Sequence, residues 1–204
     1  PYVSLSHAER RLAPDLNYLA TVYNAIDTER FCYEPNPPRG YLVQTGRLHP
    51  TKGTHHAIRL ARAVGMSLYL AGPVEGDCRS YFEEQIQPHL DQTHVFYLGN
   101  LSPEEVKQLI SRATAFLGLI EFEEAFGLAT VEAMACGTPV IGMRRGAHEE
   151  TIMDGVTGLL VSSVEEGIER FAEVLQIDRS ICSEATTRRF SIDVMTEGYL
   201  RVYE

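Results

Sequence analysis

The chain has 204 residues, of which 44% are hydrophobic and 23% are charged. A chain of this length and composition can bury one substantial core, which excludes intrinsic disorder, collagen-like repeats and peptide-scale scaffolds. The 18 lysines and arginines against 28 aspartates and glutamates give a formal charge of -10, and so acidic a surface disfavours binding to a nucleic acid polymer or to anionic lipid. Any phosphate-binding site must therefore depend on a small cluster of positive charge and not on the charge of the whole surface.

The cysteines and the apolar segments indicate a soluble protein of a reducing compartment. The four cysteines are scattered without the spacing of a zinc knuckle or a redox pair, and no disulfide framework is implied. The longest apolar stretches are too short to cross a bilayer, and the first residues lack the basic and apolar regions of a secretion signal. We therefore expect a cytoplasmic protein without a transmembrane segment.

The beginning of the chain differs from the rest. Pro14 is followed by Pro35, Pro37 and Pro38, and the last three make residues 33–39 a candidate linker. We expect residues 1–39 to form a lead-in segment and residues 40–190 to form the main domain.

From about Gly40 onward, short apolar runs alternate with segments of helical period. This alternation is typical of a parallel sheet with helices on both faces. It predicts an α/β fold with a Rossmann-like, doubly wound parallel sheet of about six strands. The expected strands are residues 41–45, 67–71, 95–98, 115–120, 139–141 and 158–161.

A capping box predicts a helix that begins at Pro103. Ser102 supplies the N-cap, and Glu105 stands at the position of the capping-box acid. Apolar side chains follow at helical intervals and are expected to face the sheet: Val106, Leu109, Ile110 and Ala113.

A second capping-box spacing, from Ser163 to Glu166, predicts another helix that covers the sheet. A short carboxyl-terminal helix is expected over residues 192–203, after a break near Ser191, so that residues 191–204 form a separate segment. The expected buried stripe of the helix after Ser163 is Val164, Ile168, Phe171, Ala172 and Leu175.

The loop after the first expected strand, residues 46–53, is the first candidate phosphate site. In open α/β sheets, ligands bind beyond the carboxyl ends of the strands. There Arg47 can contact two phosphate oxygens and Lys52 can supply a point charge, beside Gly46 and Gly53. The alternative is that the glycines serve turns and the cations are solvated.

The second candidate is the stretch that begins at Glu124. A helix that starts near Phe126 points free backbone amides at a diphosphate, and Gly127 lets the ligand approach the backbone. Glu132 lies at most about 12 Å from Glu124 if the stretch is helical, so the two acids can bracket a ligand. The alternative is that Glu124 caps the helix, Glu132 lies on a solvated face and Leu128 belongs to the core.

Histidines are the third feature. His148 follows the fifth expected strand and can act as a proton carrier, although a lone loop histidine is more often a surface residue. His49, His55 and His56 lie close together in the sequence. No cysteine or acidic partner stands at metal-ligand spacing, so the interpretation without a metal is favoured.

Together these motifs resemble the carboxyl-terminal, donor-binding half of a retaining glycosyltransferase of the GT-B fold, family 4, often called group 1. The two glutamates, Glu124 and Glu132, are the most specific mark of that family. The resemblance extends from about Val22 to the end of the chain. Among the departures, Ile120 and Glu121 stand where a Pro-Ser pair is common.

The resemblance implies a role for each matching residue. Arg47 and Lys52 would hold the diphosphate of a nucleotide diphosphate sugar, Glu132 would bond the ribose hydroxyls and Glu124 would contact the donor sugar. No metal or cofactor is expected, since the cations and the helix end stabilise the leaving diphosphate. The implied catalytic residues are Arg47, Lys52 and Glu124. The implied donor-binding residues are Gly46, Arg47, Lys52, Leu98, Asn100, Leu101, Glu124, Phe126, Gly127, Leu128 and Glu132, with residues 98–101 beside the base.

A complete GT-B enzyme has two such domains, and the sequence resembles one of them. We therefore expect an amino-terminal acceptor domain, or a subunit that supplies it, as partner, and little or no activity from the chain alone. Leu5, Leu12 and Leu16 of the lead-in would then lack a packing partner. The alternatives are a non-catalytic nucleotide-sugar-binding or subunit-interaction module and, less well matched, a nucleotide-sugar epimerase. The base, the sugar and the acceptor stay open.

Overall fold

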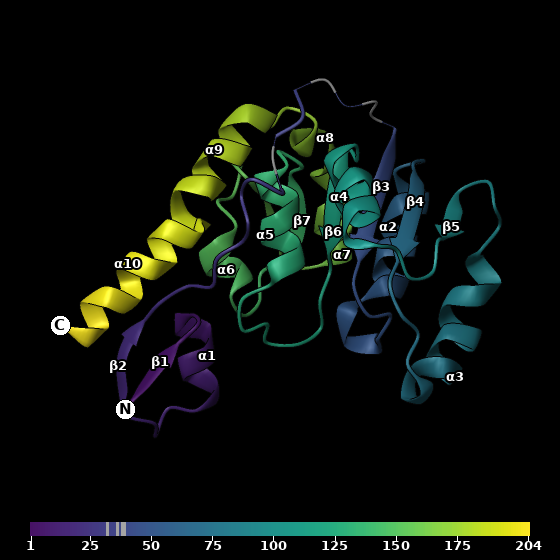
Figure 1. Ribbon diagram of the computed structural model, residues 1–204. Helices are drawn as coiled ribbons and strands as arrows, with labels where there is room; N and C mark the ends of the chain where they lie inside the picture. Colours follow the sequence, from purple (N-terminus) through teal and green to yellow (C-terminus); the bar gives the residue numbers. More distant parts are fainter. Residues whose placement is uncertain (32, 36, 38–39) are drawn as a thin grey trace.

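The computed structural model describes residues 1–31, 33–35, 37 and 40–204, so Cys32, Asn36, Pro38 and Arg39 of the lead-in and expected linker lie outside the described residues. The described chain contains a six-stranded sheet and a two-stranded sheet (Figure 1). The strands of the large sheet are all parallel and follow the order β5-β4-β3-β6-β7-β8. They are β3 (Tyr41–Thr45), β4 (Ser67–Ala71), β5 (Val95–Tyr97), β6 (Ala115–Gly118), β7 (Val140–Met143) and β8 (Gly158–Val161). The structure confirms the predicted α/β fold with a parallel sheet of six strands.

Helices cover both faces of this sheet. Because parallel strands are joined by right-handed crossovers, the helix after β3 and the helices after β5 and β6 lie on opposite faces. On one face α2 packs against α7, and on the other α5 packs against α9 (Figure 1). The helices around the sheet are α2 (Thr54–Ala63), α3 (Arg79–Tyr81), α4 (Pro103–Ser111), α5 (Leu128–Ala135), α6 (His148–Thr151), α7 (Val164–Glu169), α8 (Phe171–Val174), α9 (Arg179–Phe190) and α10 (Ile192–Tyr203). Short 3-10 or π turns are η1 (Pro50–Lys52), η2 (Gly76–Cys78), η3 (Phe82–Ile86) and η4 (Gln87–His89).

Local sequence signals fix several helix ends. The capping box at α4 is complete, since Ser102 accepts from the Glu105 amide and the Glu105 side chain accepts from the Ser102 amide. At α7, Ser163 accepts from the Glu166 amide, but the Glu166 carboxylate accepts from the Ser162 amide instead. Ser191 caps α10, which follows the break that was expected near this residue.

The buried stripe expected after Ser163 is wrong at its end. The helix is interrupted at Arg170, which separates α7 from α8, and the interruption changes which side chains face the sheet. Ala172 and Leu175 are exposed, and Val174 is buried in their place. The following helix, α9, is also missing from the sequence-based expectation.

The amino-terminal lead-in is a folded unit. It contains β1 (Tyr2–Ser4), α1 (His7–Leu12) and β2 (Tyr18–Thr21), and the two strands pair in parallel. The unit lies beside α10 and apart from the large sheet (Figure 1). The Glu150 carboxylate joins it to the main domain by accepting from the amides of His7 and Ala8 and from the Tyr23 hydroxyl. Leu12 and Leu16 are exposed and Leu5 is partly buried.

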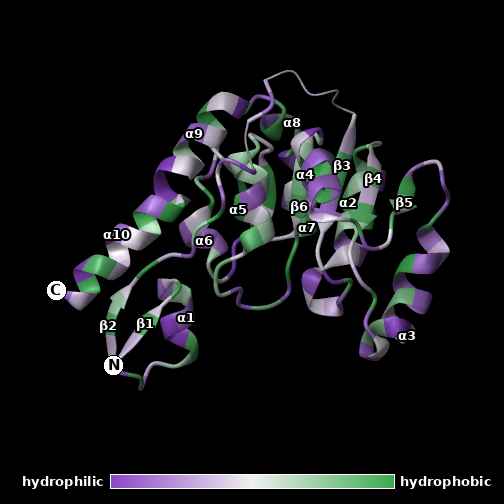
Figure 2. Cartoon of the chain, in the orientation of Figure 1, coloured by the Kyte–Doolittle hydropathy of each residue, from purple (hydrophilic) through white to green (hydrophobic). Residues whose placement is uncertain are grey.

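The core lies on both faces of the large sheet. Fully buried side chains include Leu42, Leu68, Leu117, Ile141 and Leu159, one from each of five strands. Figure 2 shows hydrophobic residues along these strands and a mixture of polar and apolar residues on α10. The three described cysteines, Cys78, Cys136 and Cys182, are buried and form no disulfide. Among the described residues, no helix combines the length and the apolar character needed to span a bilayer.

Candidate functional site

Three loops meet at the carboxyl edge of the sheet, after β3, β6 and β7. Glycines allow their close contact. A Cβ on Gly53, which has φ +66°, would lie 1.8 Å from the Leu119 carbonyl oxygen. A Cβ on Gly146, which has φ +57°, would lie 2.3 Å from the Glu124 amide nitrogen. The backbone therefore brings the three loops together before any ligand is considered.

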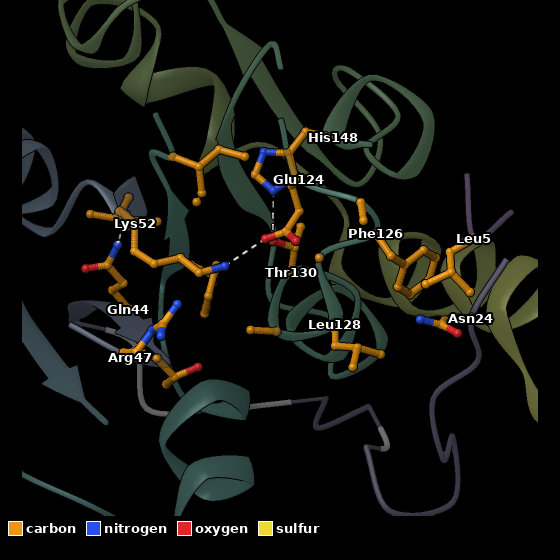
Figure 3. A pocket seen from close by; sticks show the side chains of 18 residues that line it. Leu5, Asn24, Gln44, Arg47, Lys52, Glu124, Phe126, Leu128, Thr130 and His148 are labelled. Carbon is orange, nitrogen blue, oxygen red and sulfur yellow. Dashed lines mark hydrogen bonds and ion pairs between the residues drawn. The ribbon is translucent and has the colours of Figure 1, made fainter. Parts of the chain in front are cut away.

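The first cavity at this edge, of about 360 Å³, contains an ion pair between Lys52 and Glu124. The Lys52 Nζ lies 2.7 Å from Glu124 Oε2, and the Glu124 side chain is only 16% exposed. Figure 3 shows the two side chains pointing toward one another. The cavity is lined by Leu5, Asn24, Gln44, Thr45, Arg47, Lys52, Phe116, Leu117, Gly118, Ile120, Glu124, Ala125, Phe126, Gly127, Leu128, Ala129, Thr130 and His148.

Two further contacts hold Lys52 in place. The Gln44 side-chain amide donates to the Lys52 carbonyl over 2.8 Å, and the Lys52 ammonium lies 4.6 Å from the centre of the Phe122 ring. A contact of this kind is attractive, because the face of an aromatic ring carries partial negative charge. Lys52 is thus an oriented cation, not the solvated side chain of the alternative.

His148 forms the floor of the first cavity. It is 1% exposed, which contradicts the expectation of a surface histidine. Nδ1 lies 3.2 Å from the Met143 carbonyl and Nε2 lies 3.2 Å from the Thr130 hydroxyl. Because Nδ1–H donates to the carbonyl, Nε2 is left to accept from Thr130. Burial lowers the pKa of His148 to about 4, so the ring is neutral at physiological pH and cannot be a cation for a ligand.

The helix expected near Phe126 begins at Leu128. Gly127, with φ +87°, is the N-cap and supplies no side chain. The first amides of a helix have no intrahelical acceptor, so those of Leu128 and Ala129 are available at the cavity that both residues line. Glu124 lies in the preceding loop and does not cap the helix. Leu128 is 47% exposed, so its assignment to the core is wrong.

A second cavity, of about 350 Å³, adjoins the first. It contains Glu132, whose carboxylate is partly buried and makes no hydrogen bond or ion pair with any residue that the structure describes. Burial raises the pKa of Glu132, and the charge of Arg30 partly offsets this rise. The lining residues are Thr45, Gly46, Ala71, Gly72, Pro73, Asn100, Leu101, Val106, Leu128, Ala129 and Glu132.

The two cavities share the walls formed by Thr45, Leu128 and Ala129. They therefore make one continuous depression, here called the trough, with Glu124 at one end and Glu132 at the other. The start of α5 lies between the two ends, so its free amides face the middle of the trough.

The other predicted site residues line one of the two cavities, with the exception of Leu98. Arg47 lines the first cavity, and its Nη1 lies 2.9 Å from Glu75 Oε2 in an exposed ion pair. Gly46, Asn100 and Leu101 line the second cavity. Leu98 is 39% exposed and lines neither cavity. All other predicted site residues are brought to the trough.

Several residues of the trough were not predicted from the sequence. Gln44 and Thr45 end β3, Thr130 lies in the first turn of α5, and Asn24 comes from the segment after the amino-terminal unit. Position at the carboxyl end of a strand is the signal that could have identified Gln44 and Thr45. Asn24 gives no such signal, because only tertiary packing brings it to the cavity.

Comparisons with known proteins show which sequences and structures the chain is similar to. The family model described as glycosyl transferases group 1 matches residues 25–189. Glycogen synthase of Mycobacterium tuberculosis is 33% identical over 154 residues, which are 72% of this chain and 36% of that protein. Trehalose synthase of Pyrococcus horikoshii is 30% identical over 190 residues, which are 85% of this chain and 45% of that protein. The chain thus spans less than half the length of these relatives.

Among solved structures, Anabaena Alr3699/HepE in complex with UDP and glucose has the same fold, with a TM-score of 0.81 and 21% identity. The match covers 98% of this chain and 62% of that one. Because the match covers nearly the whole chain, it includes both the two-stranded and the six-stranded sheet.

Proposed function

Since the chain belongs to the glycosyl transferases group 1 family, we propose that it is the donor-binding part of a retaining GT-B glycosyltransferase. It binds a nucleotide diphosphate sugar, whose sugar is transferred to an acceptor hydroxyl. The observation that carries this proposal is the trough: two cavities of about 360 and 350 Å³ share one wall and hold an acid at each end. The acceptor domain belongs to a further part of the protein or to another subunit.

The second cavity is assigned to the nucleoside. Glu132 is a carboxylate without a partner among the described residues, and two neighbouring ribose hydroxyls would satisfy it. Asn100 and Leu101 lie in the same cavity, where they would contact the base. UDP is the first nucleotide to test, because the structurally similar HepE binds UDP.

The diphosphate is assigned to the middle of the trough. The free amides of Leu128 and Ala129 and the positive end of α5 favour an anion there. Arg47 and Lys52 reach the same region, but each is ion-paired in this structure, with Glu75 and Glu124 respectively. Binding therefore exchanges these carboxylates for phosphate oxygens.

The first cavity is assigned to the donor sugar and to the reaction. The bond between the anomeric carbon and the diphosphate oxygen breaks, and its electron pair leaves with the diphosphate. Arg47, Lys52 and the helix amides stabilise the charge that develops on that oxygen, so the proposed step needs no metal. Glu124, only 16% exposed, contacts the sugar. The acceptor oxygen then bonds to the anomeric carbon with overall retention, and its proton is released.

The proposal is tested by calorimetric titration of the purified chain with UDP, GDP and ADP. We expect saturable binding of one nucleotide, weakened about tenfold or more in Arg47→Ala and Glu132→Ala, because each removes a charged hydrogen-bonding partner. Arg188→Ala and Glu184→Ala are matched controls, since these side chains form an exposed ion pair on α9.

Two outcomes would contradict the proposal. Binding that all four substitutions leave unchanged would place the nucleotide outside the trough. Failure of all three nucleotides to bind, both to the chain alone and after the acceptor part is restored, would exclude a donor site. Without that part we expect little transfer. Nucleotide-sugar binding that never leads to transfer would favour the non-catalytic module instead.

A further inference from the structure

A compact cluster of metal-ligand residues lies outside the trough. His55 and His56 are in the first turn of α2, and Glu121 is in the segment after β6. Glu121 Oε1 lies 2.6 Å from His56 Nε2 and 3.3 Å from His55 Nε2. The three possible ligand atoms all lie within 4.8 Å of one another. The acidic partner that the local sequence lacks is therefore supplied from 65 residues away.

The histidine rings are oriented by their surroundings. His55 Nδ1 lies 2.9 Å from the Tyr81 hydroxyl, which leaves Nε2 directed at Glu121. A hydrogen bond at the second ring nitrogen is the usual device that fixes a metal-binding histidine.

The segment that carries Glu121 is also held in place. The Glu121 main-chain amide donates to the Thr51 carbonyl over 2.7 Å, which ties this segment to the η1 turn before α2. The three side chains are between 22% and 40% exposed, so an ion can reach them. His56 and Glu121 also line a polar cavity of about 330 Å³.

From this arrangement we propose that His55 Nε2, His56 Nε2 and the Glu121 carboxylate bind one divalent transition-metal ion of the zinc class. Two imidazoles and one carboxylate are a set that zinc accepts, with a water at the fourth position. The ion would fasten the start of α2, which follows Lys52, to the segment that leads to Glu124. It would be a structural clip beside the trough and would take no part in the proposed transfer step.

A second cluster must be distinguished from this one. His49, Asp77 and Cys78 also place possible ligand atoms within 4.8 Å of one another. The His55 cluster is the stronger candidate, because its donors already converge on one oxygen and one ring has an orienting partner. Cobalt separates the two, since a thiolate ligand adds a sulfur-to-metal charge-transfer band that imidazole and carboxylate ligands lack.

The test is titration of the metal-free 204-residue chain with Zn²⁺ by calorimetry and with Co²⁺ by visible absorption. We expect one site, cobalt d–d bands without a thiolate band, and a melting temperature that rises with zinc. His56→Ala and Glu121→Gln should each weaken zinc binding by about a hundredfold or more, because each removes a direct ligand. Tyr81→Phe should weaken it less, about tenfold, since it changes only the orientation of His55.

His94→Ala and Cys78→Ser are the controls and should leave zinc affinity within about twofold of the parent. Melting of each metal-free variant shows whether it folds. The proposal is overturned if His56→Ala and Glu121→Gln fold and bind zinc as tightly as the parent. It is also overturned if the cobalt spectrum contains a thiolate band that Cys78→Ser removes. Nucleotide titration is a separate readout, so failure here leaves the proposed function standing.

Discussion

The two ends of the trough hold their acids in different ways. Glu124 is paired with Lys52 at 2.7 Å, and the neutral ring of His148 lines the same cavity. Glu132 makes no hydrogen bond or ion pair with any described residue, and burial raises its pKa, an effect that the charge of Arg30 partly offsets. The first end is thus organised by contacts within the protein, whereas the carboxylate at the second end receives no hydrogen bond from the described residues. The two ends should therefore respond differently to substitution and to a ligand.

The largest expected effect comes from the backbone contact that shapes the first end. Gly53→Ala would place a Cβ 1.8 Å from the Leu119 carbonyl oxygen, at a φ of +66°. The clash is with main chain, so the loop that carries Lys52 or the end of β6 must move. We expect the free energy of unfolding to fall by about 3–5 kcal/mol, measured by urea denaturation.

Gly65→Ala is the matched control for this substitution. Gly65 has nearly the same φ, +68°, but an added Cβ would meet nothing within 4 Å. Its cost should be only that of the left-handed backbone, about 1–2 kcal/mol. Equal losses in the two variants would mean that the contact between Gly53 and Leu119 contributes nothing to the first end.

The second prediction concerns the acid sensitivity of His148. Its pKa is lowered from 6.5 to about 4 in the folded protein by burial. Between these two pKa values the imidazole is protonated in the unfolded chain but neutral in the folded protein. The free energy of unfolding therefore decreases as the pH falls from 6.5 toward 4. The loss amounts to about 3 kcal/mol, because one pKa unit corresponds to about 1.36 kcal/mol.

Urea denaturation of the parent and of His148→Gln across this pH range measures that loss. The variant should lie below the parent at neutral pH and lose less stability on acidification. His94→Gln, which changes a side chain that is 63% exposed, should follow the parent curve. Parallel curves for the parent and His148→Gln would show that His148 is not a buried neutral ring.

The third prediction addresses the second end. Glu132→Gln removes a carboxylate whose charge is disfavoured by burial. Because the folded-state pKa is raised, the penalty is absent below the ordinary pKa of 4.5 and appears as the pH rises through the folded value. The ligand-free variant should therefore be more stable than the parent at neutral pH. It should bind the nucleotide about tenfold more weakly, because a charged acceptor for the ribose is lost.

Calorimetry and urea denaturation test the two parts of this prediction. Glu184→Gln is the control, since the Glu184 side chain is 59% exposed and paired on α9. If Glu132→Gln instead destabilises the free protein, the carboxylate is satisfied within the fold and the contrast between the two ends disappears.

The sequence predicts the strands of the large sheet well, because each is a short apolar run that alternates with segments of helical period. The order of the strands in the sheet was not predicted and comes from the structure. Prediction from the sequence fails where tertiary context decides. The interruption at Arg170 changes the face of α8 without a proline or glycine at that position. The amino-terminal unit contacts the main domain through Glu150, which is far away in the sequence. Neither contact leaves a local pattern.

The candidate site likewise contains features that the sequence predicts and features that it does not. Residues that follow strands, such as Arg47, Lys52 and Glu124, are predictable, because parallel strands end at one edge of the sheet. Pairings are not predictable, because they join separate loops. The Lys52–Glu124 ion pair and the His56–Glu121 contact span 72 and 65 residues respectively. The burial of His148 beneath its loop depends on the packing of α5 and β7 and is equally hidden.

The smallest expected effect tests whether a cation at the first end is restrained before binding. Arg47 is paired with Glu75 at 2.9 Å, and the two side chains are 46% and 49% exposed. An exposed pair is weak, so Glu75→Gln should raise the affinity for the nucleoside diphosphate only about twofold, measured by calorimetry. The matching nucleoside, which lacks phosphates, should bind both proteins equally. If Glu75→Gln raised the affinity for the nucleoside by the same factor, the effect would arise at the second end, because Arg47 can strengthen binding only of a ligand that carries phosphate.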